Sequence, residues 1–261
     1  MSRIRSFQTG EGWVGDLRKT VILSFDYEIF FGPDCGVVAD CLIRPTERIL
    51  DELKRVNGRA VFFVDYLMLK RMREECDETR KTALAVEEQL REILRGGSRI
   101  ELHLHPHWID AKYRGNGKWD FSDNRHYCLS SLPEETVTSL FVEGTDYLNR
   151  LARQVLPDYK VKVFRAGGWA VLPFAHLANG FRNAGIRIDS SVSSGIVLGN
   201  GDDRRDFSKA PKASVYSFSN DVTCADSEGE FVEIQITSFR FNLLTYVLNA
   251  LHRRLNRRKY F

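Results

Sequence analysis

Cysteine, long apolar runs and an excess of charge of one sign are all scarce in this chain of 261 residues. The five cysteines are odd in number and scattered, and no two of them stand at zinc-finger spacing, so we expect a reducing compartment. Residues 1–21 mix charged and apolar side chains, which is unlike a signal peptide, and no stretch is long enough to span a bilayer. These absences predict a cytoplasmic protein.

The charge balance argues against a nucleic-acid partner. Lys and Arg total 38 and Asp and Glu total 35, which leaves a formal net charge of only +3. The length and the hydrophobic content of 43% suit one sizeable core. Because an α/β barrel can hold about 250 residues in one domain, we expect a single domain over residues 1–261.

Apolar runs of strand character alternate with helical patterns along most of the chain. We expect strands at 21–25, 60–64, 99–105, 161–164 and 186–188, helices at 45–56, 77–95, 133–155 and 173–184, and two further strands at 214–218 and 231–236. This alternation predicts parallel strands joined by helical crossovers. Either an open doubly wound sheet or a β/α barrel satisfies it.

Polar side chains stand just after the carboxyl ends of four of the expected strands. They are Asp26 with Glu28, the histidines from His103 to His107, Arg165 and Asp189. In a barrel these strand ends meet at one face, where such folds carry their catalytic groups. An open sheet would spread them along a line. The sequence therefore favours the barrel.

Three of the six histidines fall within five residues. The period of two places His103 and His105 on one face of a strand, and Pro106 ends that strand because it cannot donate to a ladder. Around this break His103 and His107 can converge as neutral nitrogen ligands for a metal such as zinc. The plainer alternative is a polar strand end whose histidines bind only to the backbone.

These motifs resemble those of the polysaccharide deacetylases of the NodB-homology type. Residues 24–28, Ser-Phe-Asp-Tyr-Glu, look like a variant of the first family motif, a strand followed by two acids. Residues 97–107 are similar to the second, a glycine, an apolar strand and two histidines four apart. Residues 164–169, Phe-Arg-Ala-Gly-Gly-Trp, resemble the third, and Asp189 lies where a fourth places an acid. The resemblance implies a distorted seven-stranded parallel β/α barrel.

The resemblance also implies a metal-dependent hydrolase that removes an acyl group, typically an N-acetyl, from a carbohydrate or glycan precursor. The metal would be zinc, or another divalent transition metal such as cobalt or manganese. Its ligands would be Glu28, His103 and His107. Positions left open on the metal would serve water and the substrate carbonyl, as a catalytic rather than a structural site requires.

Three further residues receive catalytic roles from the same resemblance. Asp26 would be the general base, and Arg165 would pair with it and keep it ionised. Asp189 could in turn orient Arg165. One departure from the motif is that Tyr27 separates the two acids, so that a solvated loop acid is the alternative role for Glu28.

A second departure concerns the general acid. The family's last motif supplies a histidine that protonates the leaving amine, and residues 231–237 contain none. His252 lies in a helical pattern that suits a surface or interface, which leaves His105 and His126 as the remaining candidates. An amidohydrolase of a small cyclic amide and a catalytically inactive sugar-binding barrel therefore stay open beside the deacetylase.

Two other segments suggest contacts with substrate or membrane. Residues 110–131 form a long connection that suits either a substrate lid or a disordered insertion. The rings of Tyr27, Trp108, Trp119 and Trp169 could form the floor of a sugar site, and core packing explains them equally well. Residues 241–260 predict a basic amphipathic helix, which would pack against the barrel or lie peripherally on an anionic membrane.

Overall fold

Seven strands form one mostly parallel sheet in the computed structural model, which describes residues 20–29, 36–201, 204–238 and 243–255. The strands, in sheet order, are β1 (Ser24–Tyr27), β2 (Val61–Asp65), β3 (Arg99–Leu104), β6 (Val163–Ala166), β7 (Ile188–Asp189), β11 (Phe231–Ile234) and β10 (Val215–Phe218). Each neighbouring pair is parallel except β10 with β11. The expected α/β class is therefore confirmed.

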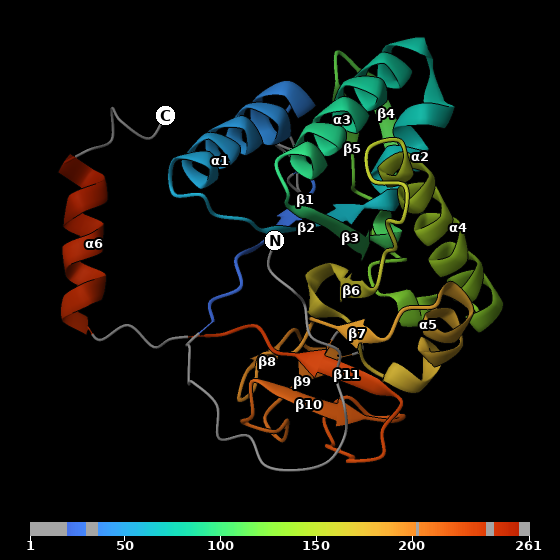
Figure 1. The fold of residues 1–261 in the computed structure, drawn as a ribbon, viewed down its shortest axis with the longest axis vertical. Coiled ribbons are helices and arrows are strands. Elements are labelled where there is room, and N and C mark those ends of the chain that lie inside the picture. Colours follow the sequence, from blue (N-terminus) through green and yellow to red (C-terminus); the bar gives the residue numbers. More distant parts are fainter. Residues whose placement is uncertain (1–19, 30–35, 202–203, 239–242, 256–261) are drawn as a thin grey trace.

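Five helices lie along one side of this sheet (Figure 1). They are α1 (Arg44–Arg55), which a π-helical turn at Ala39–Ile43 precedes, α2 (Tyr66–Glu75), α3 (Asp77–Arg95), α4 (Glu134–Arg153) and α5 (Ala178–Ala184). Parallel neighbours need crossover connections, and these helices supply them between β1 and β7. Doubly wound sheets carry helices on both faces, so the one-sided arrangement of the described helices favours the barrel-like alternative.

The sheet is strongly curved. Arg165 lies on β6 and Asp26 on β1, three steps apart in the strand order. A flat sheet would separate these strands by about 14 Å. Nevertheless a guanidinium nitrogen of Arg165 lies 2.7 Å from a carboxylate oxygen of Asp26. No ladder among the described residues joins β1 to β10, so closure into a barrel stays a prediction.

Most expected elements form close to their predicted bounds, and one helix was not expected. Helix α3 has the bounds 77–95 that its periodicity predicts. Helix α2 follows β2 without a loop, because Asp65 caps it by accepting a hydrogen bond from the Leu67 amide at 3.2 Å. The extended backbone of Cys76 then separates α2 from α3. The first residues of α2 are apolar and buried on every side, so they lack a helical pattern and look in the sequence like a continuation of β2. This is why the helix was not expected.

Residues 110–131 are an ordered excursion and not a disordered insertion. They contain a hairpin of β4 (Lys112–Gly115) and β5 (Lys118–Asp120), followed by a 3₁₀ turn at Leu129–Ser131. The ring of Trp119 packs edge-on against Trp108, with 5.1 Å between the centroids. Tyr27, Trp108 and Trp119 are all buried in the core. Of the four aromatic residues considered for a sugar floor, only Trp169 is partly exposed.

The last strands close one end of the core. Strands β8 (Val197–Leu198) and β9 (Arg205–Asp206) form a small hairpin before β10. Aromatic rings from α4, β6, α5, the 3₁₀ turn before α5 and the last strands pack against one another with centroids about 4.5–5.7 Å apart. They are Phe141, Phe164, Phe174, Phe181, Phe218 and Phe231. This cluster anchors β10 and β11 beside α5.

The expected C-terminal helix is present as α6 (Leu243–Leu255), which stands apart from the sheet in Figure 1. Tyr246, Val247 and Leu248 are 69%, 44% and 56% exposed, so these side chains are not packed into the core. The basic residues expected at 257–259 lie outside the described residues. In the described part of the chain, no helix is both long enough and apolar enough to cross a membrane.

Candidate metal centre

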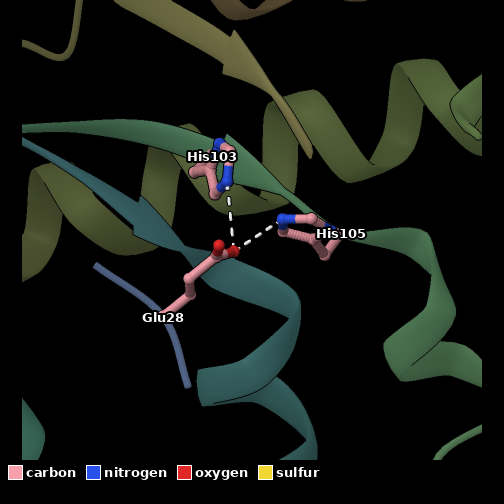
Figure 2. A group of neighbouring side chains, drawn as sticks. All are labelled: Glu28, His103 and His105. Atoms are coloured by element: carbon pink, nitrogen blue, oxygen red, sulfur yellow. Dashed lines mark ion pairs between the residues drawn. The ribbon is translucent and has the colours of Figure 1, made fainter. Parts of the chain in front are cut away.

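Two histidines and a glutamate converge at the carboxyl ends of β1 and β3 (Figure 2). Glu28 directly follows β1, His103 lies near the end of β3, and His105 directly follows β3. One ligand atom from each lies within 4.8 Å of the other two. The rule that polar groups gather where parallel strands end therefore brings Glu28 and His103 together, as the sequence predicts.

His103 has the geometry of a metal ligand. Its Nδ1 lies 2.7 Å from the main-chain oxygen of Arg165, so the ring donates there and leaves the lone pair on Nε2. That Nε2 lies 3.3 Å from an oxygen of Glu28 and is buried without a hydrogen-bond partner among the described residues. Metal-binding histidines commonly donate their second nitrogen to a carbonyl in this way.

His105 completes the group from the other side of Glu28. Its Nε2 lies 2.5 Å from the same Glu28 oxygen. Its main-chain amide donates to the buried carboxylate of Asp65 at 3.3 Å, which fixes the backbone at this position. Gly167 lies against the His105 ring, because a Cβ on that glycine would be 2.6 Å from Nδ1. Two distant segments thus determine where this imidazole lies.

His107, which the motif predicts as a ligand, lies next to the group but is not one of its three members. The centroids of the His107 and His105 rings are 4.9 Å apart. His107 also stacks on Trp108 and packs edge-on against Phe121. Burial, together with the nearby His105, lowers the pKa of His107 to about 3 and keeps the imidazole neutral. The geometry therefore favours His105 as the third ligand, and the motif favours His107.

The protonation of Glu28 and that of His103 each depend on the other residue. Burial opposes ionisation of Glu28, but interactions with the adjacent imidazoles of His103 and His105 hold the pKa of this carboxyl well below its usual range. Burial likewise opposes protonation of His103, yet the negative charge of the adjacent Glu28 raises its pKa. A negative carboxylate facing two imidazoles is an arrangement that attracts a cation.

Asp26 and Arg165 form the predicted ion pair beside this group. One nitrogen of Arg165 lies 2.7 Å from Asp26, and a second donates to the hydroxyl of Ser24 at 2.9 Å. The Nε of Arg165 donates to the main-chain oxygen of Ser190 at 2.8 Å. The guanidinium carbon also lies 4.0 Å from the ring centroid of Phe63. Arg165 is 5% exposed, so its orientation is fixed on every side.

Asp189 is close enough to Arg165 for their charges to attract, but it does not bind the guanidinium directly. No hydrogen bond joins the two side chains, and Asp189 instead accepts from the amide and hydroxyl of Ser191, at 3.1 and 2.8 Å. The Ser191 hydroxyl accepts in turn from the amide of Ala166, at 2.9 Å. The hydrogen bonds by which Asp189 could orient Arg165 are therefore indirect, through Ser191 and the amide of Ala166.

The three-residue group suits zinc or a similar divalent metal. Two imidazole nitrogens and one carboxylate oxygen are the ligand types of catalytic zinc sites. Ligand atoms around tetrahedral zinc lie about 3.3–3.5 Å apart, and the Glu28 to His103 separation is 3.3 Å. The 2.5 Å between Glu28 and His105 is a hydrogen-bond distance, so a bound metal would move these two atoms apart. The buried, unpartnered Nε2 of His103 supports the same assignment.

Several residues important to the site were not expected from the sequence. Asp65 ends β2 and holds His105, and burial raises the pKa of Asp65 to about 7. Ser190 binds Arg165 through its oxygen and its hydroxyl. Glu233 on β11 stands opposite Asp189. Each looks like an ordinary strand or loop residue; only the position of Asp65 at a strand end could have indicated it.

The remaining histidines do not extend the site. The Nδ1 of His126 lies 2.7 Å from a carboxylate oxygen of Asp110, within the excursion. His252 is exposed on α6. Of the two candidates for a general acid, His105 and His126, only His105 belongs to the group that contains Glu28 and His103.

A comparison with protein-family models finds no match for this chain, and a comparison with curated proteins finds none either. Its function must therefore be argued from the residues and geometry of the site.

Proposed function

We propose that the chain is a metal-dependent hydrolase that removes an acyl group, typically acetyl, from a carbohydrate or glycan precursor. The observation that carries the proposal is the double role of Arg165. Its main-chain oxygen anchors His103, and its guanidinium binds Asp26. One residue thereby holds both a group that could bind a metal and a carboxylate that could accept a proton. Hydrolysis at a metal uses both of these groups.

Glu28, His103 and His105 would hold the metal, with His107 as the alternative third ligand that the motif predicts. When bound, zinc, cobalt or manganese would supply Lewis acidity towards an acyl carbonyl. Asp26 is 32% exposed at its side chain, so it can reach solvent and substrate. It would accept a proton from the attacking water while Arg165 keeps it oriented.

The acyl-carbohydrate substrate class follows from the NodB-type motifs, and the curvature of the sheet is compatible with the barrel of that family. Trp169 is partly exposed and lies two residues after Gly167, the glycine that packs against the His105 ring. An aromatic surface beside polar groups is a common contact for sugar rings. Trp169 is therefore our candidate for the contact with the carbohydrate.

Metal content of single variants tests the ligand set. The chain would be loaded with zinc and dialysed, and bound metal would be measured for the parent and for His103→Ala, His105→Ala and His107→Ala. His126→Ala is the matched control, because His126 binds Asp110 outside the group. We expect loss of metal for His103→Ala and His105→Ala and retention for the other two. Retention by His105→Ala with loss by His107→Ala would instead support the motif's ligand set.

Acetate release tests the activity. The parent would be assayed with and without zinc on N-acetylated and O-acetylated oligosaccharides and on small cyclic amides. Zinc-dependent release from the oligosaccharides supports the proposal, and ring opening alone would favour the cyclic amidohydrolase. Binding of metal and sugar without any hydrolysis would identify an inactive sugar-binding protein.

A further inference from the structure

Two buried carboxyl groups lie on neighbouring strands of the sheet, and neither belongs to the candidate ligand group. Asp189 on β7 and Glu233 on β11 are directly paired in the parallel ladder. Both side chains are 0% exposed. Residues paired on adjacent strands have neighbouring side chains, and two ionised carboxylates so placed in a buried site would repel each other strongly.

The donors around this pair do not account for all four carboxyl oxygens. The amide and hydroxyl of Ser191 donate to the two oxygens of Asp189. The amide of Val192 donates to Oε1 of Glu233 at 3.1 Å. Within the described residues, Oε2 of Glu233 has no hydrogen-bond partner. A buried acceptor without a donor is costly, but a protonated oxygen would itself donate to Asp189.

We propose that Glu233 is a neutral carboxylic acid which donates its proton to Asp189, and that this pair is a positioning device for Arg165. The link runs through the segment that follows Asp189. Ser190 binds Arg165 with its main-chain oxygen at 2.8 Å, and its hydroxyl donates to the main-chain oxygen of Ile234, next to Glu233, at 2.9 Å. Ser191, held by Asp189, binds the amide that follows Arg165.

The positioning role rests on the proposed function, because it concerns the orientation of Arg165 towards Asp26. The shared proton does not depend on that function. If the pair were doubly ionised, its two strands would repel each other directly beneath Ser190. The guanidinium would then lose the fixed carbonyl that orients it towards Asp26. Glu233 itself touches neither substrate nor metal ligands in this arrangement, so it acts only through the 190–192 segment and Arg165.

The charges that face the pair are few. Arg165 on β6 interacts favourably with both carboxyls, and Tyr216 on β10 is close enough for their charges to act on its phenol. Burial, reinforced by the charge of Asp189, raises the pKa of Glu233 well above its ordinary value. Burial also raises the pKa of Tyr216, so the phenol stays neutral. Asp26 is separated from the pair by Arg165, to which it binds.

The folded state consequently binds a proton that the unfolded chain has already released. Stability from this proton is fully present below the ordinary pKa of glutamate. It is lost as the pH rises towards the raised pKa of Glu233, by up to about tenfold in the unfolding equilibrium constant per pH unit. A group at position 233 that cannot titrate would remove this part of the pH dependence.

Glu233→Gln is the decisive variant, because its amide can donate to Asp189 permanently while its oxygen still accepts from Val192. Glu233→Ala removes both interactions, and Glu228→Gln is the matched control on the exposed surface. Infrared spectra of the full chain at neutral pH would be compared for the carbonyl stretch of a protonated carboxylic acid. We expect the band in the parent and in Glu228→Gln, with a clear decrease in Glu233→Gln.

Urea unfolding of the same proteins between pH 5 and pH 9 supplies the second measurement, with the range chosen to begin above the ordinary glutamate value of about 4.3. We expect the stability of Glu233→Gln to decline less steeply with pH than that of the parent. If activity is found, its loss on the alkaline side should also be delayed in Glu233→Gln, whereas Glu233→Ala should be slow at every pH.

An unchanged carbonyl band in Glu233→Gln, or parallel pH dependences of the parent and this variant, would overturn the shared proton. The positioning role would be overturned if Glu233→Ala lost its activity at the same raised alkaline pH as Glu233→Gln. Because the infrared and urea measurements need no turnover, failure of the proposed hydrolase would leave them interpretable.

Discussion

Replacement of Arg165 by lysine should separate the stability of the site from its ability to bind metal. The guanidinium makes four hydrogen bonds, to Asp26, to Ser24, and to the oxygen and the hydroxyl of Ser190. A lysine ammonium keeps the positive charge but lacks the planar fork, so it can retain one of these bonds. At about 1 kcal/mol for each of the three bonds lost, and up to about 1 kcal/mol for the stacking on Phe63, we expect a decrease of about 3–4 kcal/mol in the free energy of unfolding.

Metal binding by this variant should change little, because the Arg165 atom that anchors His103 is a main-chain oxygen. Hydrolysis should fall by about 10²-fold, since Asp26 would lose its fixed orientation. Urea titration by linear extrapolation, metal analysis and initial rates measure the three quantities. Arg187→Lys, at an exposed pair with Glu230, is the control and should stay within about 0.5 kcal/mol of the parent. The reasoning is refuted if Arg165→Lys is as stable as this control, or if it loses metal as completely as His103→Ala.

Three other outcomes follow from the site. Gly167→Ala places a methyl group 2.6 Å from the His105 ring, so metal affinity should fall by about tenfold or more in a zinc titration; unchanged affinity would exclude His105 as a ligand. Asp26→Asn should keep its metal and lose turnover, whereas Glu28→Gln should lose metal, and the reverse result would exchange their roles. Because a general acid is typically worth about 10² to 10⁴ in rate and residues 231–237 contain no histidine, O-acetyl esters should be cleaved faster than matched N-acetyl amides; equal rates would point to another proton source.

The positions of the polar groups along the strands were largely predictable. A strand of period two that ends at a proline fixes His103 near the carboxyl end of β3, and the carboxyl end of β1 fixes Asp26 and Glu28. The placement of these groups needed only local patterns and one topological rule. The pairing of Arg165 with Asp26 was instead implied by the resemblance to the deacetylase motifs, and the structure contains this ion pair.

The choice between His105 and His107 could not be made from spacing. After Pro106 the chain enters a 3₁₀ turn at Pro106–Ile109, so the period of the strand no longer determines where a side chain points. Trp108 and Phe121 then take up one side of His107, and Gly167 leaves room for the ring of His105. Each of these contacts depends on tertiary packing.

Glu233 illustrates a second limit of the sequence. Its strand lacks the histidine that the family motif would supply, and the alternation of Glu233 with Val232 and Ile234 contains no local sign that the glutamate is buried. The structure buries it opposite Asp189, 44 residues earlier in the chain. A buried acid can be recognised only when its partner is known, since an unpaired carboxyl at the same position would be too costly.

The arrangement around β6 also determines how the parts of the site depend on one another. Arg165 on this strand holds His103 through its main-chain oxygen and Asp26 through its guanidinium. Gly167, directly after the strand, leaves the space that the His105 ring occupies. A displacement of β6 would therefore move the ligand group and the carboxylate together. The 190–192 segment braces this strand from the side of β7, which is why a proton buried between β7 and β11 can matter to a site that neither carboxyl touches.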